Sequence, residues 1–490
     1  MTWVHPLVPD AAEPADVLGA KAHGLITLRR LGLPVPPGFV VGAPACRAFL
    51  RDGRFPDGLR GELDAAVADL EAATGRRLGG PGRPLALAVR SGGAVSMPGM
   101  MSTILNLGLT AEATAALAAD TGDEAFAHDS RRRFLESLTA AMSGTAPAAR
   151  DTAANGPSRP RVPPSVAGLG TAVPEDARAQ LDLAVRAVFA SWNTARAQTY
   201  RAVHGVPDGA GTAVTVQAMV FGNRDGRSGT GVAFSRDPST GEHVPSGEVL
   251  FAAQGEDVVS GRSSPLRLSA LAEREPGLWA DLAGALRRIE EHYRDACHVE
   301  FTFESGALWL LQVRAGGLTG RAAVRVAVDL ADAGLIDRRE AVRRVSPRDL
   351  RLARAPRLDP AGRDVLARGV GASPGVATGR VAATADDAVR MAADGPVVLV
   401  RPETSPLDMH GLAAAAGVVT AVGGTTSHAA VVARSMGRPA VVGARGLDVP
   451  AGTLVTIDGT GGEVVAGRAG TVASPDPHLG RLLAWAGAAG

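Results

Sequence analysis

The chain has 490 residues, of which 46% are hydrophobic and 21% charged, so it is long enough for several domains and is not a largely disordered protein. Its 51 basic and 50 acidic residues give a formal charge of +1, and no basic run interleaved with aromatics predicts a nucleic-acid partner. No apolar run reaches the length of a membrane span and the N-terminus lacks signal-peptide features, so we expect a cytoplasmic protein.

The first unusual residue along the chain is Lys21, which is the only lysine beside 50 arginines. This bias suggests a site where a compact ammonium group is needed and a planar guanidinium would not fit. A chance leftover on a surface helix explains a single lysine equally well. The two cysteines, Cys46 and Cys297, have no disulfide or metal-ligand spacing, which predicts buried, unpaired thiols.

The segment 85–109 predicts a strand that ends near Arg90 and continues into a loop of Gly, Ser and Met. Small residues let backbone amides approach phosphate oxygens, and an arginine supplies a fixed positive fork. This pattern indicates a nucleotide lid, although an ordinary surface loop would have a similar composition.

A long irregular loop is predicted from about 141 to 176, because this run is rich in Pro, Gly, Ala and Ser and has no period. Residues 177–203 have apolar side chains at helical spacing, and residues 212–222 and 229–242 have the pattern of strands that end in turns. The core should consist mainly of Ala, Val and Leu, because only 4% of the residues are aromatic.

Residues 297–314 predict a β-hairpin that turns at Ser305-Gly306. In such a hairpin Glu300, Gln312 and Arg314 lie near one another across the two strands. The Arg-rich, Pro-broken segment 346–369 suits a hinge better than a core element.

The C-terminal part, residues 370–470, alternates Val-rich strands with short helices and predicts a compact α/β module. Within it, GGTTSHAAVVARSMGRPAVVG predicts a glycine turn, an N-cap at Ser427, and a helix that begins at His428 and ends before Gly437. A helix start lowers the pKa of an imidazole and favours an anion beside it. His428 is therefore a candidate phosphoryl acceptor, and a histidine that only caps or packs is the alternative.

Together these motifs resemble the pyruvate, phosphate dikinase family of PEP-utilising enzymes. The matching stretches follow the family's order: LGAKAHGL, VRSGGAVSMPGMM, FAHDSRRRF, VQAMVFGN, SGTGVAFSRDPSTGE, AQGEDVVSG, VEFTFESGALWLLQVR, ASPGVATG and GGTTSHAAVVAR. The resemblance implies an α/β and α+β multidomain chain in which an ATP-grasp nucleotide-binding region precedes a swivelling α/β phosphohistidine domain. The expected boundaries are 1–345 for a two-lobed nucleotide-binding region, 346–369 for the hinge, 370–475 for the phosphohistidine domain and 476–490 for a tail.

By resemblance, each site residue receives a role. His428 is the phosphoryl carrier, while Lys21 and Arg90 bind phosphates and support catalysis. The remaining nucleotide-binding and Mg²⁺-binding positions are Gln217, Met219, Val220, Glu256 and Arg314 for the nucleotide, and Glu300 and Gln312 for the metal ion.

Three features depart from the family pattern, and one of them is the loop at 141–176, which replaces a region that is helical in the family. The resemblance ends before the (β/α)₈ barrel in which relatives bind PEP or pyruvate, so these 490 residues are expected to lack that domain. His298 also stands where the family has an aspartate, two residues before the metal-binding glutamate.

The leading hypothesis is an ATP-dependent, dikinase-type phosphotransferase that uses Mg²⁺, ATP and inorganic phosphate, forms AMP and phosphorylates His428. The acceptor would be pyruvate on a separate barrel-bearing chain, with no nucleic-acid or membrane partner and a homodimer as the oligomeric state to be tested. The alternatives are a nucleotide-binding pseudoenzyme or regulatory protein, and a phosphotransferase to another small molecule.

Overall fold

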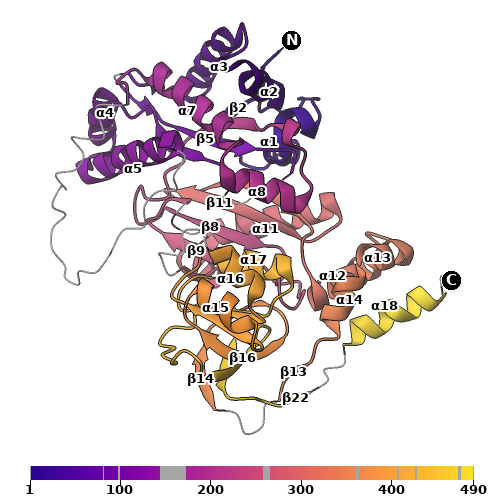
Figure 1. The fold of residues 1–490 in the computed structure, drawn as a ribbon. Coiled ribbons are helices and arrows are strands. Elements are labelled where there is room, and N and C mark those ends of the chain that lie inside the picture. The colour runs from indigo at the N-terminus through magenta and orange to yellow at the C-terminus, as the bar shows by residue number, and fades with distance from the viewer. Residues whose placement is uncertain are drawn as a thin grey trace. The chain divides into compact units, whose positions relative to one another are not determined.

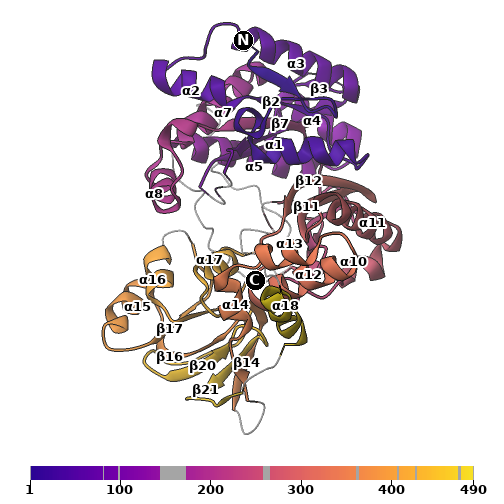
Figure 2. The same cartoon turned by 90° about the vertical axis from the view of Figure 1, so that its right-hand side faces the viewer.

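The protein divides into two units, Met1–Val220 and Phe221–Gly490, both of which combine helices with sheets (Figure 1 and Figure 2). A computed structural model describes residues 2–80, 82–95, 97, 100–143, 173–255, 257, 265–359, 364–405, 408–424, 427–472 and 476–488. The mixed α/β and α+β class expected from the sequence is confirmed.

The first unit is built on a five-stranded antiparallel sheet with the order β1-β2-β7-β5-β6. Its strands are β1 (Val4–Pro6), β2 (Gly38–Val41), β5 (Leu87–Gly92), β6 (Thr103–Leu107) and β7 (Ala213–Ala218), with a separate short pair β3 (Arg77–Leu78) and β4 (Pro84–Leu85). Its helices are α1 (Ala15–Arg30), α2 (Ala43–Asp52), α3 (Leu59–Thr74), α4 (Ala111–Thr121), α5 (Glu124–Ser143), α7 (Ala177–Ser191), α8 (Ala195–His204) and the 3₁₀-helix η1 (Asp208–Ala210). Val and Leu side chains of this sheet form one buried cluster with α3, α5 and α7.

The predicted strand before Arg90 is β5, so that prediction is confirmed. The predicted helix 177–203 is instead two helices, because the chain breaks after Ser191. The break buries the indole of Trp192, which donates to the carbonyl of Asp208. The predicted loop begins later than expected, since α5 extends to Ser143, and its residues 144–172 lie outside the described part of the chain.

The second unit begins with an antiparallel sheet of order β10-β9-β8-β11-β12. Its strands are β8 (Gly229–Phe234), β9 (Ser246–Phe251), β10 (Leu266–Arg267), β11 (Cys297–Glu304) and β12 (Ala307–Ala315). The helices around it are α10 (Ser269–Arg274), α11 (Pro276–Tyr293), α12 (Gly320–Asp332), α13 (Arg338–Arg344), α14 (Pro347–Ala353) and α18 (Pro477–Ala488). The predicted hairpin is confirmed, because β11 and β12 are joined at Ser305 and Gly306, whose φ values of 50° and 83° suit a type I′ turn.

The C-terminal module of the second unit, from β14 to β21, is an eight-stranded sheet with the order β14-β21-β20-β16-β17-β18-β19-β15. The strands are β14 (Val365–Arg368), β15 (Val370–Ser373), β16 (Val376–Ala382), β17 (Val397–Arg401), β18 (Gly417–Thr420), β19 (Ala440–Val442), β20 (Leu454–Asp458) and β21 (Glu463–Ala466). The helices are α15 (Ala385–Ala392), α16 (Met409–Ala414) and α17 (His428–Met436). Buried Ala, Val and Leu side chains form its two apolar clusters, as the composition predicts.

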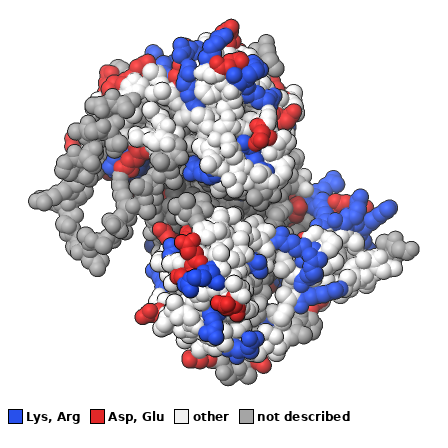
Figure 3. Space-filling model, viewed as in Figure 1, with Lys and Arg blue, Asp and Glu red and all other residues white. Residues whose placement is uncertain are grey.

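The segment 346–369, predicted as a hinge, contains more regular structure than expected. It includes α14, the short strand β13 (Arg357–Leu358) and β14, and Ala353 is buried in an apolar cluster with α12, α13 and α18. Arg351 and Arg354, in α14 and at its end, are exposed, so the Arg-rich composition concealed an apolar face. Figure 3 shows basic side chains gathered over α13 and α14. β13 pairs with β22 (Thr471–Val472), so the two connections to the C-terminal module run side by side.

Both cysteines are buried and unpaired, as predicted. Burial raises the pKa of the Cys46 thiol to about 11 and that of Cys297 to about 12. None of the helices in the described ranges has the length and apolar content that a bilayer span requires.

Candidate functional site

His428 lies at one edge of the C-terminal module, where parallel strands end. β17 and β18 are parallel neighbours, so the loops that follow them meet at the same edge of the sheet. The second loop turns at Gly423, whose φ is 101°, and the hydroxyl of Ser427 accepts from the backbone N–H of Ala430 at 3.5 Å. α17 then runs from His428 and stops at Gly437, whose φ is 66°. The predicted helix start, N-cap and C-terminal glycine are all confirmed.

The two ring nitrogens of His428 have different surroundings. Nδ1 lies 3.2 Å from the hydroxyl oxygen of Thr404, whereas Nε2 is buried and has no hydrogen-bond partner among the described residues. Burial lowers the pKa of His428, and the carboxylate of Asp408 opposes this shift. The direction agrees with the sequence prediction, and burial of the ring is its largest cause.

A neutral imidazole with one nitrogen hydrogen-bonded and the other open is arranged as a nucleophile. Thr404, which fixes this arrangement, was not among the predicted residues. Thr404 lies in the loop after the Val-rich strand β17, which could be predicted, but the parallel pairing with β18 that brings this loop to the histidine loop was not predicted.

A second group of polar residues lies on one face of the β8–β12 sheet. Glu300 is paired with Gln312 on β12 and with Val232 on β8, and Val232 is paired with Glu248 on β9. Cross-strand partners point to the same side of a sheet, so these residues form a row. With its amide oxygen toward Arg314, Gln312 accepts hydrogen bonds from that guanidinium at 2.8 and 2.9 Å. The predicted cluster of Glu300, Gln312 and Arg314 is therefore present.

The donor atoms of Glu300 and Gln312 fit a magnesium ion. Mg²⁺ prefers oxygen ligands and usually keeps several waters or substrate oxygens in its shell. The described residues contain no group of three or more His, Cys, Asp and Glu side chains that could hold a metal ion. An ion bound by this carboxylate and amide would thus depend on phosphate oxygens for much of its coordination.

His298, which replaces the family's aspartate, occupies the next row of the same face. Its imidazole stacks on Phe234 with ring centroids 4.8 Å apart and an angle of 17° between the planes, and Arg314 is its partner on β12. Burial lowers the pKa of His298 to about 4, so the imidazole is neutral at neutral pH. The stack offers an aromatic surface where a carboxylate would have offered charge.

The histidine loop contacts this same face. A Cβ atom at position 424 would lie 1.8 Å from Oε1 of Glu248, so only glycine leaves room for that carboxylate. Arg434, from α17, is buried deeply enough to lower its pKa to about 10, while the charge of Glu248 acts in the opposite direction. The loop before His428 and the sheet with Glu300 are thus in direct contact within the second unit.

In the first unit, a break in α1 at Gly19 places Lys21 beside β5, the strand that carries Arg90. Gly19 has a φ of 79° and its Cα approaches the backbone of Gly92 so closely that a Cβ atom would lie 1.7 Å from the Gly92 carbonyl oxygen. Lys21 lies beside this contact, because a Cβ at Gly92 would be 3.5 Å from the Cβ of Lys21. Arg90 is two residues earlier in β5, opposite Thr215 of β7.

The predicted adenine-binding segment begins within β7 and ends with the first unit. Gln217 is buried and its amide donates to the carbonyl of Pro36 at 3.1 Å, and the backbone N–H of Met219 donates to Ala86 at 2.8 Å. Val220 is the last residue of that unit. Glu256 lies outside the described residues.

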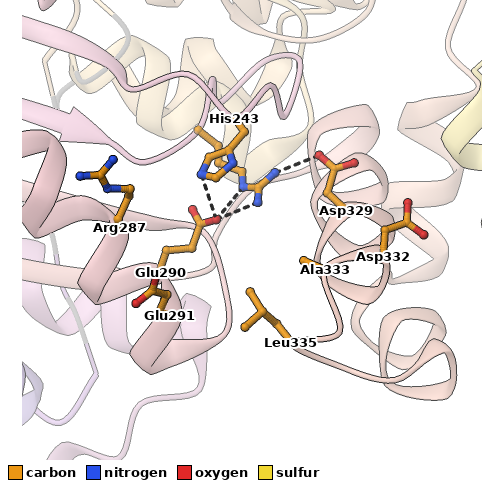
Figure 4. A pocket seen from close by; sticks show the side chains of 9 residues that line it. His243, Arg287, Glu290, Glu291, Asp329, Asp332, Ala333 and Leu335 are labelled. Atoms are coloured by element: carbon orange, nitrogen blue, oxygen red, sulfur yellow. Dashed lines mark hydrogen bonds and ion pairs between the residues drawn. The ribbon is translucent and has the colours of Figure 1, made fainter.

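A cavity of about 360 Å³ lies elsewhere in the second unit, between α11 and the end of α12 (Figure 4). None of the predicted site residues lines it. Buried Arg236 donates to Glu290 at 2.7 and 3.0 Å and to Asp329 at 2.9 Å, and Ser235 donates to Glu290 at 2.5 Å. We call Arg236, Glu290 and Asp329 the Arg236 cluster. Both carboxylates of the cluster are thus paired with the same guanidinium.

Two family models match the sequence. Residues 47–278 match "Pyruvate phosphate dikinase, AMP/ATP-binding domain" and residues 393–462 match "PEP-utilising enzyme, mobile domain". The first match includes Arg90 and the segment from Gln217 to Val220, and the second includes His428.

Whole-chain comparison finds relatives named pyruvate, phosphate dikinase. The protein of Rhizobium meliloti (strain 1021) is 42% identical over 531 residues, which cover 98% of this chain and 59% of the relative. Pyruvate, phosphate dikinase 2 of Oryza sativa subsp. japonica is 42% identical over 513 residues, covering 96% and 57%. A solved structure titled Enzyme I (nEIt) shares 32% identity over 19% of this chain, with a TM-score of 0.13.

The chain spans 59% of the R. meliloti relative and 57% of the O. sativa relative. Both matched domains occur in the order expected from the motifs, and the similarity extends over nearly all of the 490 residues. The chain therefore belongs to the pyruvate, phosphate dikinase family, of which it contains the AMP/ATP-binding domain and the mobile domain.

Proposed function

We propose that this chain uses ATP and inorganic phosphate to phosphorylate its own His428, with release of AMP and pyrophosphate. The observation that supports this most directly is the state of the imidazole: Nε2 is buried and unpartnered among the described residues, while Nδ1 is fixed by Thr404. In this proposal Nδ1 carries the ring proton and donates a hydrogen bond to the threonine oxygen, which leaves the lone pair of Nε2 free to attack.

Nε2 attacks the β-phosphorus of ATP, the bond from that phosphorus to the oxygen shared with the α-phosphate breaks, and AMP leaves with the oxygen. Inorganic phosphate then attacks the γ-phosphorus of the histidine-bound diphosphate and leaves as pyrophosphate, so one phosphoryl group remains on His428. The phosphoryl group departs to an acceptor in a last step, and the imidazole is restored.

The other predicted residues would bind and neutralise ATP. Lys21 and Arg90 would contact phosphate oxygens and offset charge that develops during transfer. Glu300 and Gln312 would hold Mg²⁺, which supplies positive charge at the phosphates, and Arg314 would contact a phosphate next to them. Gln217, Met219, Val220 and Glu256 are proposed to contact the nucleotide.

For the acceptor we propose pyruvate, bound by a barrel domain outside these 490 residues, because the relatives are named for pyruvate. Transfer to another small molecule is the alternative for this last step. A different function is favoured by one observation: at position 298 an imidazole stacked on Phe234 replaces a carboxylate beside Glu300. A nucleotide-binding protein that has lost phosphoryl transfer would have this property.

The test uses ATP labelled at the β-phosphate, with Mg²⁺ and inorganic phosphate. We expect an acid-labile, base-stable label on the protein together with AMP, and complete loss of the label in His428→Ala and His428→Asn. ATP binding measured by calorimetry should be unchanged in both variants, which separates loss of the acceptor from loss of the fold. Label that persists in the variants, or ADP in place of AMP, would contradict the proposal. ATP binding without any label in the parent would support the nucleotide-binding alternative.

A further inference from the structure

Arg348 joins the helix that begins at His428 to the linker that precedes its module. Its Nη2 donates to the carbonyl oxygens of Arg434 and Ser435, each at 2.9 Å. These carbonyls belong to the last turn of α17, where no further turn of helix supplies N–H donors and where the helix dipole favours a cation. Figure 2 shows α14, which contains Arg348, next to α17.

The helix that presents Arg348 is firmly anchored. Ser346 and Asp349 form a capping box at its start, and Asp349 also accepts from the backbone N–H of Gly320 at the first residue of α12. At the other end Ala353 is buried, and its carbonyl accepts from Arg321 of α12 at 3.1 Å. Arg348 is therefore held by the linker helices and not by the C-terminal module that it contacts.

At the opposite end, the segment before α17 is held by different residues. Position 424 lies against the carboxylate of Glu248 on the β8–β12 sheet. A third contact, from the hydroxyl of Ser239 to the carbonyl of Gly371 at 3.3 Å, joins the loop after β8 to β15. The His428 helix is thus fixed near its N-terminus by the sheet and at its C-terminus by Arg348.

We propose that Arg348 is a positioning residue that seats α17, and with it His428, on the face of the sheet that bears Glu300 and Gln312. The proposal rests on the proposed carrier role of His428. The contact is made to backbone carbonyls at a helix end. It can therefore form when α17 lies against the β8–β12 sheet, and break when α17 leaves, without a change of fold in the module. A carrier that must later reach an acceptor needs a contact of this reversible kind.

A disulfide reports, without any ATP, how often the segment before α17 lies against the β8–β12 sheet. In the full chain carrying Glu248→Cys and Gly424→Cys, oxidised glutathione should close a bond between the two positions, because the end of the Glu248 side chain reaches position 424 and the two backbones are therefore about one side chain apart. The native thiols Cys46 and Cys297 are buried and have raised pKa values, so they should react slowly. Closure is followed by mass spectrometry of the peptides.

Adding Arg348→Ala should slow closure by about tenfold, as expected for the loss of two charge-assisted hydrogen bonds, and Arg348→Lys should restore part of the rate. Arg351→Ala removes an exposed arginine from the same helix and should leave the rate and the melting temperature unchanged. Equal closure rates with and without the Arg348→Ala substitution would overturn the proposal. So would a parent pair that never closes, because the seated arrangement would then not be populated.

Phosphorylation provides the second measurement, in chains that retain Glu248 and Gly424. Arg348→Ala should slow the labelling of His428 from ATP by about tenfold while the dissociation constant for ATP is unchanged, because the residue orients the acceptor and does not bind nucleotide. Unchanged labelling would count against the positioning role. If the parent chain is never labelled, the proposed function fails, whereas the disulfide measurement still decides the role of Arg348.

Discussion

Arg236 and His428 are both buried in the second unit, but they differ in whether their buried polar atoms have hydrogen-bond partners among the described residues. Each charged group of the Arg236 cluster meets an opposite charge at hydrogen-bonding distance, and the arginine is 4% exposed. Nε2 of His428 is also buried, yet no described residue hydrogen-bonds to it. The charged groups of the Arg236 cluster are thus paired, whereas Nε2 of His428 has no partner among the described residues.

This difference predicts which residues contribute mainly to folding stability and which contribute mainly to phosphorylation. A satisfied buried network fixes the helices it joins, and removing one partner leaves an uncompensated charge. A buried nitrogen without a partner lowers stability by about 1–3 kcal/mol, and its lone pair stays available to react. We therefore expect substitutions in the Arg236 cluster to act mainly on unfolding, and substitutions around His428 to act mainly on phosphorylation.

The largest expected effect is that of Arg236→Ala. The variant leaves Glu290 buried without its main partner, which should lower the free energy of unfolding of the second unit by about 3–5 kcal/mol. The measurement is urea unfolding followed by hydrogen exchange of β11 and β12, which belong to that unit. Arg287→Ala, on the exposed rim of the same cavity, is the matched control and should change the unfolding free energy by less than about 0.5 kcal/mol. Equal effects of the two variants would contradict the assigned role of the cluster.

Much of the fold could be predicted from local patterns. The hairpin at Ser305-Gly306, the strand through Arg90 and the helix from His428 to Gly437 all depend on turn and cap residues that lie within the segment itself. The break after Ser191 was missed because it depends on tertiary contacts of Trp192, which the helical spacing does not reveal. The regular structure in 346–369 was also missed, because each of its elements is short and has too few apolar residues to show a period.

The candidate site was predicted in part. Glu300, Gln312 and Arg314 could be grouped because a hairpin fixes their register, and the structure places them together. Thr404 and Arg348 could not be grouped with His428 by spacing, because they approach it from a neighbouring loop and from a linker helix. The functional roles of the predicted residues remain predictions.

A moderate effect is expected for Thr404→Val, which keeps the shape of the side chain and removes the hydroxyl. Without that partner Nδ1 no longer holds the ring in one tautomer and orientation, so labelling of His428 should slow by about five- to tenfold, equivalent to about 1 kcal/mol. Thr404→Ser retains the hydroxyl and should restore most of the rate. A valine variant that is labelled at the parent rate would show that the contact does not orient the imidazole.

The smallest effect concerns pH and tests why the imidazole stays neutral. Burial lowers the pKa of His428 in the folded chain, so labelling should stay constant as pH falls through about 6.5, where a free histidine is half protonated, and should decline only below that. The unfolded chain binds the proton at higher pH than the folded chain, so the second unit should also lose stability as pH falls below that value. Asp408→Asn removes the carboxylate that favours the imidazolium, and should move the decline in labelling to still lower pH. A parent chain whose labelling already declines at or above about pH 6.5, with ATP binding unchanged over the same range, would contradict a pKa lowered by burial. A decline that moves upward in Asp408→Asn would contradict the role assigned to that carboxylate.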